Sequence, residues 1–429
     1  MTSKKDISLN KNIILVVGKL AAKGLQSIRT YEKKNRQKFR VAYIIDSHDR
    51  TNSLIEDNLI DILITTDLTS HDKIDEALKP YKDQLIAVTC TSEARMPQFK
   101  KIIPHVPYLR TPTEKSLDWA TNKLWMRKKL YNYDKNITTK YAVVHDATKK
   151  TIKNIEEKVG FPLVVKPTGL AASVLVSVCF HEDELAKALR ATFRKIKKVY
   201  KERGRTSEPS IIVEEFMEGD NYSVDCYVTS RGKVYFCPFV HIKTGQSIGF
   251  DDFFGYRQMT PTRLEKDDRE KGQEVAKKAI HALGLRNCTG HVELMRTTTG
   301  WKVIEVGPRI GGFRDNMYRL SYGIEHTMND ILNRIPQKPI IPTKIIGYSA
   351  ALKFFAPKEG RLTKLHGTKK IQDLKSIKSI RILKKIGDRC RYAKHGGTAV
   401  IAIILFNEDR SKLLADIRRV EQALKIETK

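Results

Sequence analysis

Short apolar runs rich in valine and isoleucine alternate with amphipathic stretches through the first part of this chain, and this alternation constrains the fold most strongly. We expect strands at residues 12–18, 40–46, 61–65 and 84–89, and helices at residues 71–79 and 92–101. Strands that are covered by helices on both faces are typically continuous apolar runs, as in parallel sheets. The sequence therefore predicts an α/β fold that begins with a parallel sheet.

The glycines after the first strand do not complete a known phosphate-binding motif. Gly18 and Gly24 flank a lysine-containing stretch that matches neither the GxGxxG dinucleotide pattern nor a Walker loop. We therefore expect this part to act as a scaffold or a substrate wall, and not as a dinucleotide site.

The chain is long and strongly basic. Its 429 residues include 79 Lys and Arg against 49 Asp and Glu, which gives a net charge of +30. This length suits two or three packed domains. A positive field attracts nucleic acids, anionic membranes and phosphorylated ligands alike. The basic residues are spread along the chain, and the densest stretch, residues 194–205, is typical of a solvated helix face, so we expect no nucleic-acid partner.

Membrane and redox signals are weak. The longest apolar run, residues 398–406, is strand-sized and falls short of the ~20 residues of a membrane-spanning helix. The six cysteines are scattered and form no CxxC pair, which argues against a disulfide framework or a zinc cluster. We expect reduced thiols, a cytoplasmic location and no membrane partner.

The rest of the chain is richer in strands. A proline-rich linker at residues 97–112 precedes a helix expected at residues 114–130, with Thr113 as its N-cap. Further strands are expected at residues 161–166, 173–178, 211–216, 222–228 and 234–240, helices at 183–200 and 266–283, and a functional loop at 243–255. Residues 290–296 and 301–306 should form a β-hairpin. The tail has strand patterns at residues 348–355, 379–383 and 398–406 and ends in a helix.

The hairpin places two carboxylates, Glu293 and Glu305, on neighbouring strands. Because strand side chains alternate between faces, His291 should share a face with Glu293, and Val303 should share a face with Glu305. The opposite face would be packed by Val292, Leu294, Ile304 and Val306. Carboxylates on an apolar sheet need a partner, and Mg²⁺ binds one or two carboxylates together with phosphate oxygens. The alternative is a solvated pair on an exposed face.

An arginine and two glycines follow the second strand of the hairpin. Arginine binds carboxylate or phosphate groups through two parallel hydrogen bonds, so Arg309 is a candidate anion-binding residue. Gly311 and Gly312 would allow backbone N–H groups to approach an oxyanion closely. A surface arginine beside an ordinary turn is the alternative interpretation.

Two lysines are further candidates. Lys166 ends an apolar strand, where a charged side chain is costly unless it meets an anion. The small-residue loop 168–172 and Ser173 follow it and offer backbone N–H groups suited to phosphates. Lys123 lies in the helix expected at residues 114–130. An ordinary strand turn and a solvent-facing helical lysine are the alternatives.

The segment 213–219 is an apolar strand that runs into acidic residues and a glycine. Its backbone edge could bond an adenine while Phe216 and Met217 pack near the ring, and the acidic groups could take ribose hydroxyls. A strand that ends in a polar turn is the alternative.

In their order and spacing, these segments resemble the ATP-grasp superfamily over residues 117–312, and the lysine spacing is similar to that of its biotin carboxylase and amino-acid ligase members. The resemblance implies an N-terminal parallel α/β domain at residues 1–113, a two-lobed ATP-grasp domain at 114–340 and a small β-rich C-terminal domain at 341–429. Within the middle domain it implies a small lobe at about residues 140–212 and a hinge at 213–219.

The resemblance also implies roles for individual residues. Lys123 and Lys166 would hold the phosphates of ATP, and Glu293 and Glu305 would bind Mg²⁺ or Mn²⁺. The other nucleotide contacts would be Ser173, Glu214, Glu215, Phe216, Met217, Glu218 and Asn221. Arg309 and Lys166 would act in catalysis, and the substrate would contact Arg309, Gly311, Gly312 and His291.

Two positions depart from the family pattern. Gly307 stands where many members have an asparagine as a further metal ligand, which leaves a site of two glutamates. Asn221 stands where many have a ribose-binding glutamate, so Asn221 or Glu218 would serve that role.

The implied function is an ATP-dependent ligase that activates a small-molecule carboxylate as an acyl phosphate and transfers it to an amine. A carboxylase that phosphorylates bicarbonate is the alternative within the fold. A basic nucleic-acid-binding protein, or a regulatory ATP-binding protein without turnover, is the alternative from another class. A homodimer is compatible with the family but no residue pattern requires it.

Overall fold

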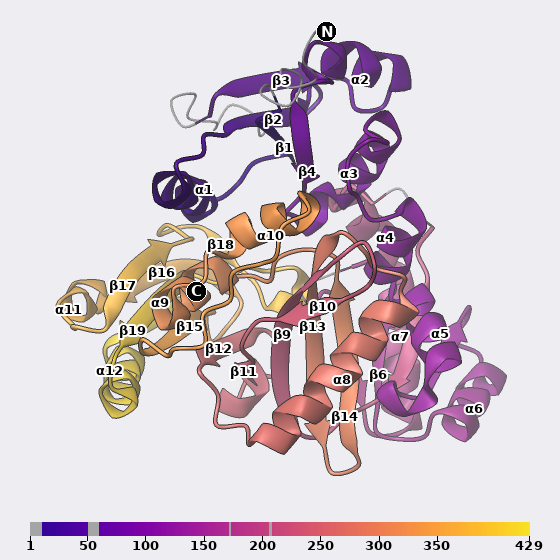
Figure 1. The fold of residues 1–429 in the computed structure, drawn as a ribbon. Coiled ribbons are helices and arrows are strands. Elements are labelled where there is room, and N and C mark those ends of the chain that lie inside the picture. Colours follow the sequence, from indigo (N-terminus) through magenta and orange to yellow (C-terminus); the bar gives the residue numbers. More distant parts are fainter. Residues whose placement is uncertain (1–10, 50–59, 171–172, 206–207) are drawn as a thin grey trace, which may run out of the picture.

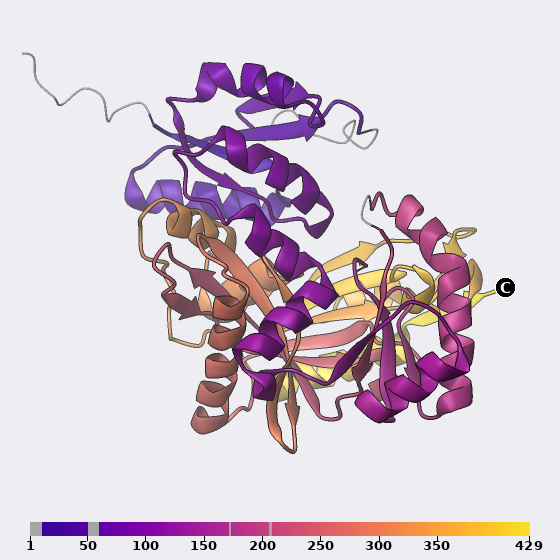
Figure 2. The same cartoon turned by 90° about the vertical axis from the view of Figure 1, so that its right-hand side faces the viewer.

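The computed structural model describes residues 11–49, 60–170, 173–205 and 208–429. The N-terminal domain lies at one end of the molecule, above a larger body that contains a small lobe and a long antiparallel sheet (Figure 1). A view turned by 90° shows the small lobe beside the large sheet and below the N-terminal domain (Figure 2). The ATP-grasp architecture expected from the sequence is confirmed.

The N-terminal domain is a four-stranded parallel sheet in the order β3-β2-β1-β4. Its elements are β1 (Ile13–Val17), α1 (Ala22–Asn35), β2 (Arg40–Asp46), β3 (Ile62–Thr66), α2 (His71–Leu78), β4 (Leu85–Thr89) and α3 (Met96–Ile102). One face packs against α2 and α3. The other face packs against α1 and, from late in the chain, α10 (His326–Arg334). The predicted parallel sheet is thus covered on both faces, which explains its continuous apolar strands.

The helix expected at residues 114–130 is in fact two helices, α4 (Glu114–Thr121) and α5 (Lys123–Tyr133). Thr113 caps α4 as expected, since its side chain accepts a hydrogen bond from the Ser116 N–H. Asn122 has an extended backbone, and its side chain accepts from the first amides of α5. Asparagine favours this capping conformation over a helix interior, so the break makes Lys123 the first residue of α5.

The small lobe is an antiparallel sheet in the order β5-β8-β6-β7. Its elements are β5 (Tyr141–Val144), α6 (Lys149–Lys158), β6 (Leu163–Pro167), β7 (Ser177–Cys179), α7 (Glu182–Glu202) and β8 (Ile211–Glu215). The strand predicted at residues 173–178 begins only at Ser177. Ser173 and Leu175 have φ angles of 59° and 57°, and this left-handed conformation is incompatible with a strand. Residues 171–172 of the predicted phosphate loop lie outside the described residues.

The large sheet has nine strands in the order β14-β13-β9-β11-β12-β15-β19-β17, with β10 paired to β9. Its first part consists of β9 (Asp220–Val228), β10 (Val234–Phe236), β11 (Val240–Thr244), β12 (Gly255–Thr260), α8 (Lys266–Ala282), β13 (Cys288–Thr297), β14 (Gly300–Gly307) and α9 (Arg314–Tyr322). The single strand expected at residues 234–240 is divided between β10 and β11 around Pro238, which lacks the N–H that a ladder needs. Sequence patterns did not predict β12, α9 or α10.

The C-terminal part continues the same sheet. Its elements are β15 (Tyr348–Phe354), β16 (Gly360–His366), α11 (Thr368–Gln372), β17 (Ile377–Ile382), β18 (Arg389–Cys390), β19 (Ile401–Asn407), α12 (Arg410–Ala423) and β20 (Lys425–Thr428). Because β15 pairs directly with β12, the boundary expected near residue 341 does not separate two sheets. Only the three strands β18-β16-β20 form a further sheet in the described tail.

The sequence also predicted that the chain has no membrane-spanning helix and that its cysteines are reduced. Among the helices of the described ranges, none combines the length and the apolar composition needed to cross a bilayer. All six cysteines lie in described segments and are buried free thiols.

Candidate functional site

A cavity of about 580 Å³ lies between the small lobe and the large sheet. Its walls come from α5, β6, the segment after β8, β11 and the hairpin β13–β14. Ten of the residues predicted from the sequence line it: Lys123, Lys166, Ser173, Glu215, Phe216, Met217, Glu218, Asn221, Glu293 and Glu305. Residues that are far apart in sequence and that were selected for nucleotide chemistry therefore meet in one cavity.

Glu293 and Glu305 are directly opposite each other on β13 and β14. The pairing shifts immediately after Glu293, so that Leu294 is opposite Val303 and Ile304 is the extra residue of a bulge. The expected alternation on β14 is therefore wrong. Val303 packs in the core with Val292, whereas Ile304 lines the cavity beside Glu305.

Lys123 connects α5 to this pair of carboxylates. Its Nζ lies 3.1 Å from Glu305 Oε1 and donates to the carbonyl oxygen of Leu170 at 2.7 Å. Burial is the largest influence and lowers the pKa of Lys123, but the neighbouring carboxylates, chiefly Glu305, outweigh it and raise the pKa. The ammonium group therefore stays charged next to the predicted metal ligands.

Glu293 is supported from the interior of the sheet. His291 Nε2 lies 3.3 Å from Glu293 Oε1. Burial, again the largest influence, raises the pKa of Glu293, but the His291 hydrogen bond and two nearby arginines lower it to about 2. Two carboxylates opposed at the wall of one cavity are the donor set that a small divalent cation prefers, so Glu293 and Glu305 fit the predicted Mg²⁺ site.

Glu214 was expected to contact the nucleotide as part of the adenine hinge, but its side chain is not in the cavity lining. Its carboxylate is buried and bonded by Arg127, whose Nε and Nη2 each lie 2.8 Å from one of its oxygens. Lys166 Nζ donates to the same carboxylate at 2.8 Å. Burial raises the pKa of Glu214, yet Arg127 and Lys166 outweigh it and hold the pKa far below its ordinary value. Glu214 therefore orients Lys166, and Arg127 is a residue that sequence reasoning missed.

The segment after β8 borders the opposite end of the cavity. The Phe216 amide donates to the carbonyl of Pro162 at 3.0 Å, and the Phe216 ring makes an edge contact with Phe253 at a centroid distance of 6.4 Å. Asn221 Oδ1 is buried and has no hydrogen-bond partner among the described residues. An unsatisfied buried oxygen needs a donor, which a ribose hydroxyl could supply.

The structure does not bring the predicted substrate residues into the cavity lining. Arg309 Nη2 instead donates to Glu93 Oε2 at 2.5 Å, across to the N-terminal domain. The Gly311 amide donates to Asp225 Oδ2 at 2.8 Å, and His291 Nδ1 lies 2.6 Å from Asp225 Oδ1. Asp225 thus binds polar groups of both Gly311 and His291, and their contact with the substrate stays a prediction. Gly312 is exposed.

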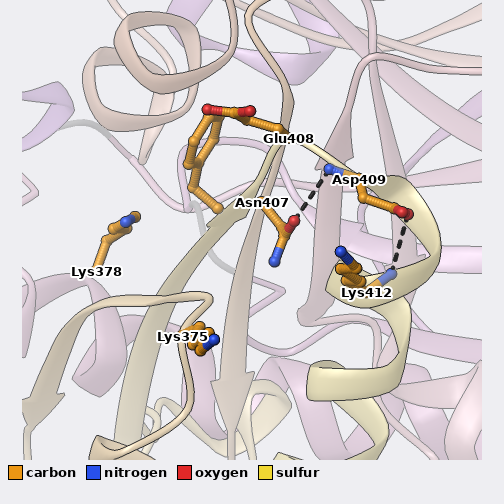
Figure 3. A pocket seen from close by; sticks show the side chains of 7 residues that line it. Lys375, Lys378, Asn407, Glu408, Asp409 and Lys412 are labelled. Carbon is orange, nitrogen blue, oxygen red and sulfur yellow. Dashed lines mark hydrogen bonds between the residues drawn. The ribbon is translucent and has the colours of Figure 1, made fainter.

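A second cavity, of about 450 Å³, lies at the start of α12 and is bordered by Lys375, Lys378 and Lys412 (Figure 3). Asp409 caps this helix by accepting from the amides of Ser411 and Lys412. A carboxylate therefore already occupies the helix N-terminus, where an anion would otherwise bind. The residues predicted for nucleotide binding line the first cavity instead.

Part of the chain is similar to a known domain family. The ATP-grasp domain family matches residues 159–316, which include Lys166, the segment after β8 and both hairpin carboxylates. The central part of the chain therefore matches an ATP-grasp domain. Proteins of this family use ATP with Mg²⁺.

The chain is similar to enzymes of more than one kind. It is 31% identical to the alanine–anticapsin ligase of Bacillus amyloliquefaciens over 37% of this chain and 35% of that protein. Its fold is similar to that of the L-amino acid ligase from Bacillus licheniformis, with a TM-score of 0.74, 17% identity, and coverage of 98% of this chain and 99% of that one. It also resembles the biotin carboxylase domain of 2-oxoglutarate carboxylase from Hydrogenobacter thermophilus, determined with MgADP and bicarbonate, with a TM-score of 0.67, 14% identity, and coverage of 96% and 90%. The chain thus spans about a third of the length of the curated ligase that it matches.

Proposed function

We propose that this protein is an ATP-dependent carboxylate–amine ligase that forms an amide or peptide bond. The observation that carries the proposal is the meeting, in one cavity, of two opposed carboxylates with lysines from two different elements. Lys123 comes from α5 and Lys166 from β6, whereas Glu293 and Glu305 come from the large sheet. The similarity to alanine–anticapsin ligase and the fold of an L-amino acid ligase favour an amino acid as the carboxylate.

In this mechanism Glu293 and Glu305 would hold Mg²⁺, which supplies charge neutralisation on the transferring phosphoryl group when it is bound. Lys166, oriented by Glu214, and Lys123, oriented by Glu305, contact the phosphate oxygens of ATP. The adenine lies at the segment after β8, near Phe216 and Met217, and Asn221 Oδ1 accepts from a ribose hydroxyl.

The chemistry has two steps. The substrate carboxylate attacks the γ-phosphorus of ATP, so that ADP leaves and an acyl phosphate forms. The amine then attacks the acyl carbon, phosphate leaves, and the amine loses a proton. The reaction takes place between the small lobe and the large sheet, and the walls of this cavity restrict the access of water to the acyl phosphate. Arg309, held by Glu93, is the nearest candidate to steady the acyl group once substrate competes for its guanidinium.

Phosphate release from ATP, measured over a panel of L-amino acids offered singly and in pairs, tests the proposal. We expect release with a carboxylate and an amine together, and an amide product by mass spectrometry. Glu305→Ala should abolish release, whereas Glu408→Ala, an exposed carboxylate at the second cavity, should not. Release that requires bicarbonate would instead indicate a carboxylase, and ATP binding without turnover would indicate a regulatory protein. We place the reaction in the cytoplasm.

A further inference from the structure

The mechanism proposed above does not use Asp225, a buried carboxylate that contacts both the hairpin strand β13 and the loop after β14. Asp225 lies in the middle of β9, with no exposed surface, directly opposite His291 on β13. Its Oδ1 lies 2.6 Å from His291 Nδ1, and its Oδ2 lies 2.8 Å from His326 Nε2 and accepts from the Gly311 amide at 2.8 Å. Arg314 Nε lies 3.9 Å from Oδ1. Both carboxylate oxygens are therefore in use.

Two of these contacts, those with His291 and Gly311, connect Asp225 to predicted site residues. His291 also contacts Glu293, since its other ring nitrogen lies 3.3 Å from Glu293 Oε1. Gly311 belongs to the loop that carries Arg309 away from the end of β14. A Cβ at Gly311 would overlap His291, so this loop packs directly on the imidazole. One carboxylate thus contacts both the strand that bears a metal ligand and the loop that bears the candidate acyl-binding arginine.

The second histidine, His326, anchors the network in the interior of the protein. His326 begins α10, and Tyr227 Oη contacts its second ring nitrogen. Burial raises the pKa of Asp225, but His291 and His326 outweigh it and keep the pKa well below its usual range. A buried charge of this kind is retained at a cost in desolvation.

We propose that Asp225 is a positioning residue that, through His291 and the Gly311 amide, sets Glu293 and the loop at residues 307–312 in register for metal binding. The proposal rests on the function proposed above. Side chains that hydrogen-bond a metal ligand affect metal affinity by ~10–100-fold in other proteins, and His291 is such a side chain for Glu293. Asp225→Asn keeps the shape of the side chain but has a single acceptor oxygen, so it cannot accept at both ends.

Isothermal titration with ADP, with and without Mg²⁺, tests this without knowledge of the substrate. The measured quantity is the gain in ADP affinity that Mg²⁺ provides. We expect Asp225→Asn to reduce that gain ~10–100-fold while metal-free ADP binding changes by less than about twofold. The matched control is Asp330→Asn, which also removes a buried carboxylate, bonded by Arg334 and Thr289, away from the cavity. Asp330→Asn should leave the gain unchanged.

The outcomes separate this inference from the proposed function. An unchanged gain in Asp225→Asn, or an equal loss in Asp225→Asn and Asp330→Asn, would overturn the inference alone. A wild-type protein in which Mg²⁺ adds nothing to ADP binding would overturn both. If Asp225→Asn does not fold, His291→Gln takes its place, because a single amide nitrogen cannot bond Asp225 and Glu293 at once with the geometry of an imidazole. The same loss is expected for it, and an unchanged gain would contradict the proposal.

Discussion

Glu214 and Asp225 are both buried carboxylates behind walls of the same cavity, and they differ in what they bind. Glu214 is bonded by two side-chain cations, Arg127 and Lys166. Asp225 is bonded by two histidines and a backbone amide. The first cluster carries excess positive charge toward the small-lobe side of the cavity, where phosphates need it. The second leads to Glu293, a predicted metal ligand.

The comparison shows that a buried carboxylate can hold either a cation or another carboxylate at the cavity wall, depending on which groups bond it. A carboxylate holds a cation in place when that cation is directly bonded to it, as with Lys166. It holds another carboxylate in place when an imidazole lies between them, as with His291. The following predictions test whether the two clusters differ in this way.

The largest effect is expected at the Glu214 cluster. Glu214→Gln leaves Arg127 buried without its ionic partner, which should cost ~3–5 kcal/mol in the free energy of unfolding. Urea denaturation measures this. Glu215→Gln, at the exposed neighbouring position, is the control and should change stability by less than ~0.5 kcal/mol. A loss below ~1 kcal/mol for Glu214→Gln would show that the cluster is not buried as described.

The next effect concerns the cation that Glu214 orients. Lys166→Met should weaken ATP binding by ~1.5–3 kcal/mol, the range of hydrogen bonds to charged groups, or about 10–100-fold. Competition with a fluorescent ADP analogue measures the affinity. Lys153→Met, an exposed lysine on α6 of the same lobe, should bind ATP like the wild type. Equal affinities for the two variants would remove Lys166 from the nucleotide site.

Acid should destabilise the protein partly through Glu214. Its pKa in the folded state is lowered from an ordinary 4.5. Below pH 4.5 the unfolded chain therefore binds a proton that the folded chain does not, and stability falls as pH falls, by at most ~1.4 kcal/mol per pH unit. Stability measured between pH 5 and pH 3 should fall less steeply in Glu214→Gln than in the wild type. Parallel curves would mean that this carboxyl titrates normally.

The smallest effect is expected at the cap of α5, the helix that carries both Lys123 and Arg127. Asn122→Ala removes the side chain that accepts from the first amides of α5 and should cost ~1 kcal/mol. It should also weaken ATP binding a few-fold, since Lys123 is the first residue of that helix. Thr148→Ala removes the corresponding cap of α6 and should cost similar stability with no change in ATP binding. If Asn122→Ala and the wild type bound ATP equally well, the cap of α5 would have no influence on the nucleotide site.

Strand alternation predicted the hairpin and its carboxylate pair, because successive side chains along a regular strand point to opposite faces of the sheet. It failed at Val303 and Ile304, whose carbonyls both accept hydrogen bonds from Arg127 beside the bulge. No local pattern in β14 indicates a bulge that is bonded by a side chain from a distant helix. Lys166 was singled out from its place at the end of an apolar strand, whereas the role of Lys123 came from the family resemblance.

The same limit applies to the acidic residues. Alternation places Glu214 and Glu215 on opposite faces, but it does not say which one meets the cavity. That choice depends on Arg127, which lies 87 residues earlier in the chain. Glu93 and Asp225 were missed because each is recognised only by its contact with a residue of another element. Glu93 bonds Arg309, and Asp225 contacts His291.

The most direct test of this account is the location of the metal. A crystal structure with ADP and Mn²⁺, in which anomalous scattering identifies the ion, should place Mn²⁺ between the carboxylates of Glu293 and Glu305 and against the nucleotide phosphates. Lys123 and Lys166 should contact those phosphates. An ion bound elsewhere, with both glutamates directed into solvent and far from any phosphate, would contradict the account.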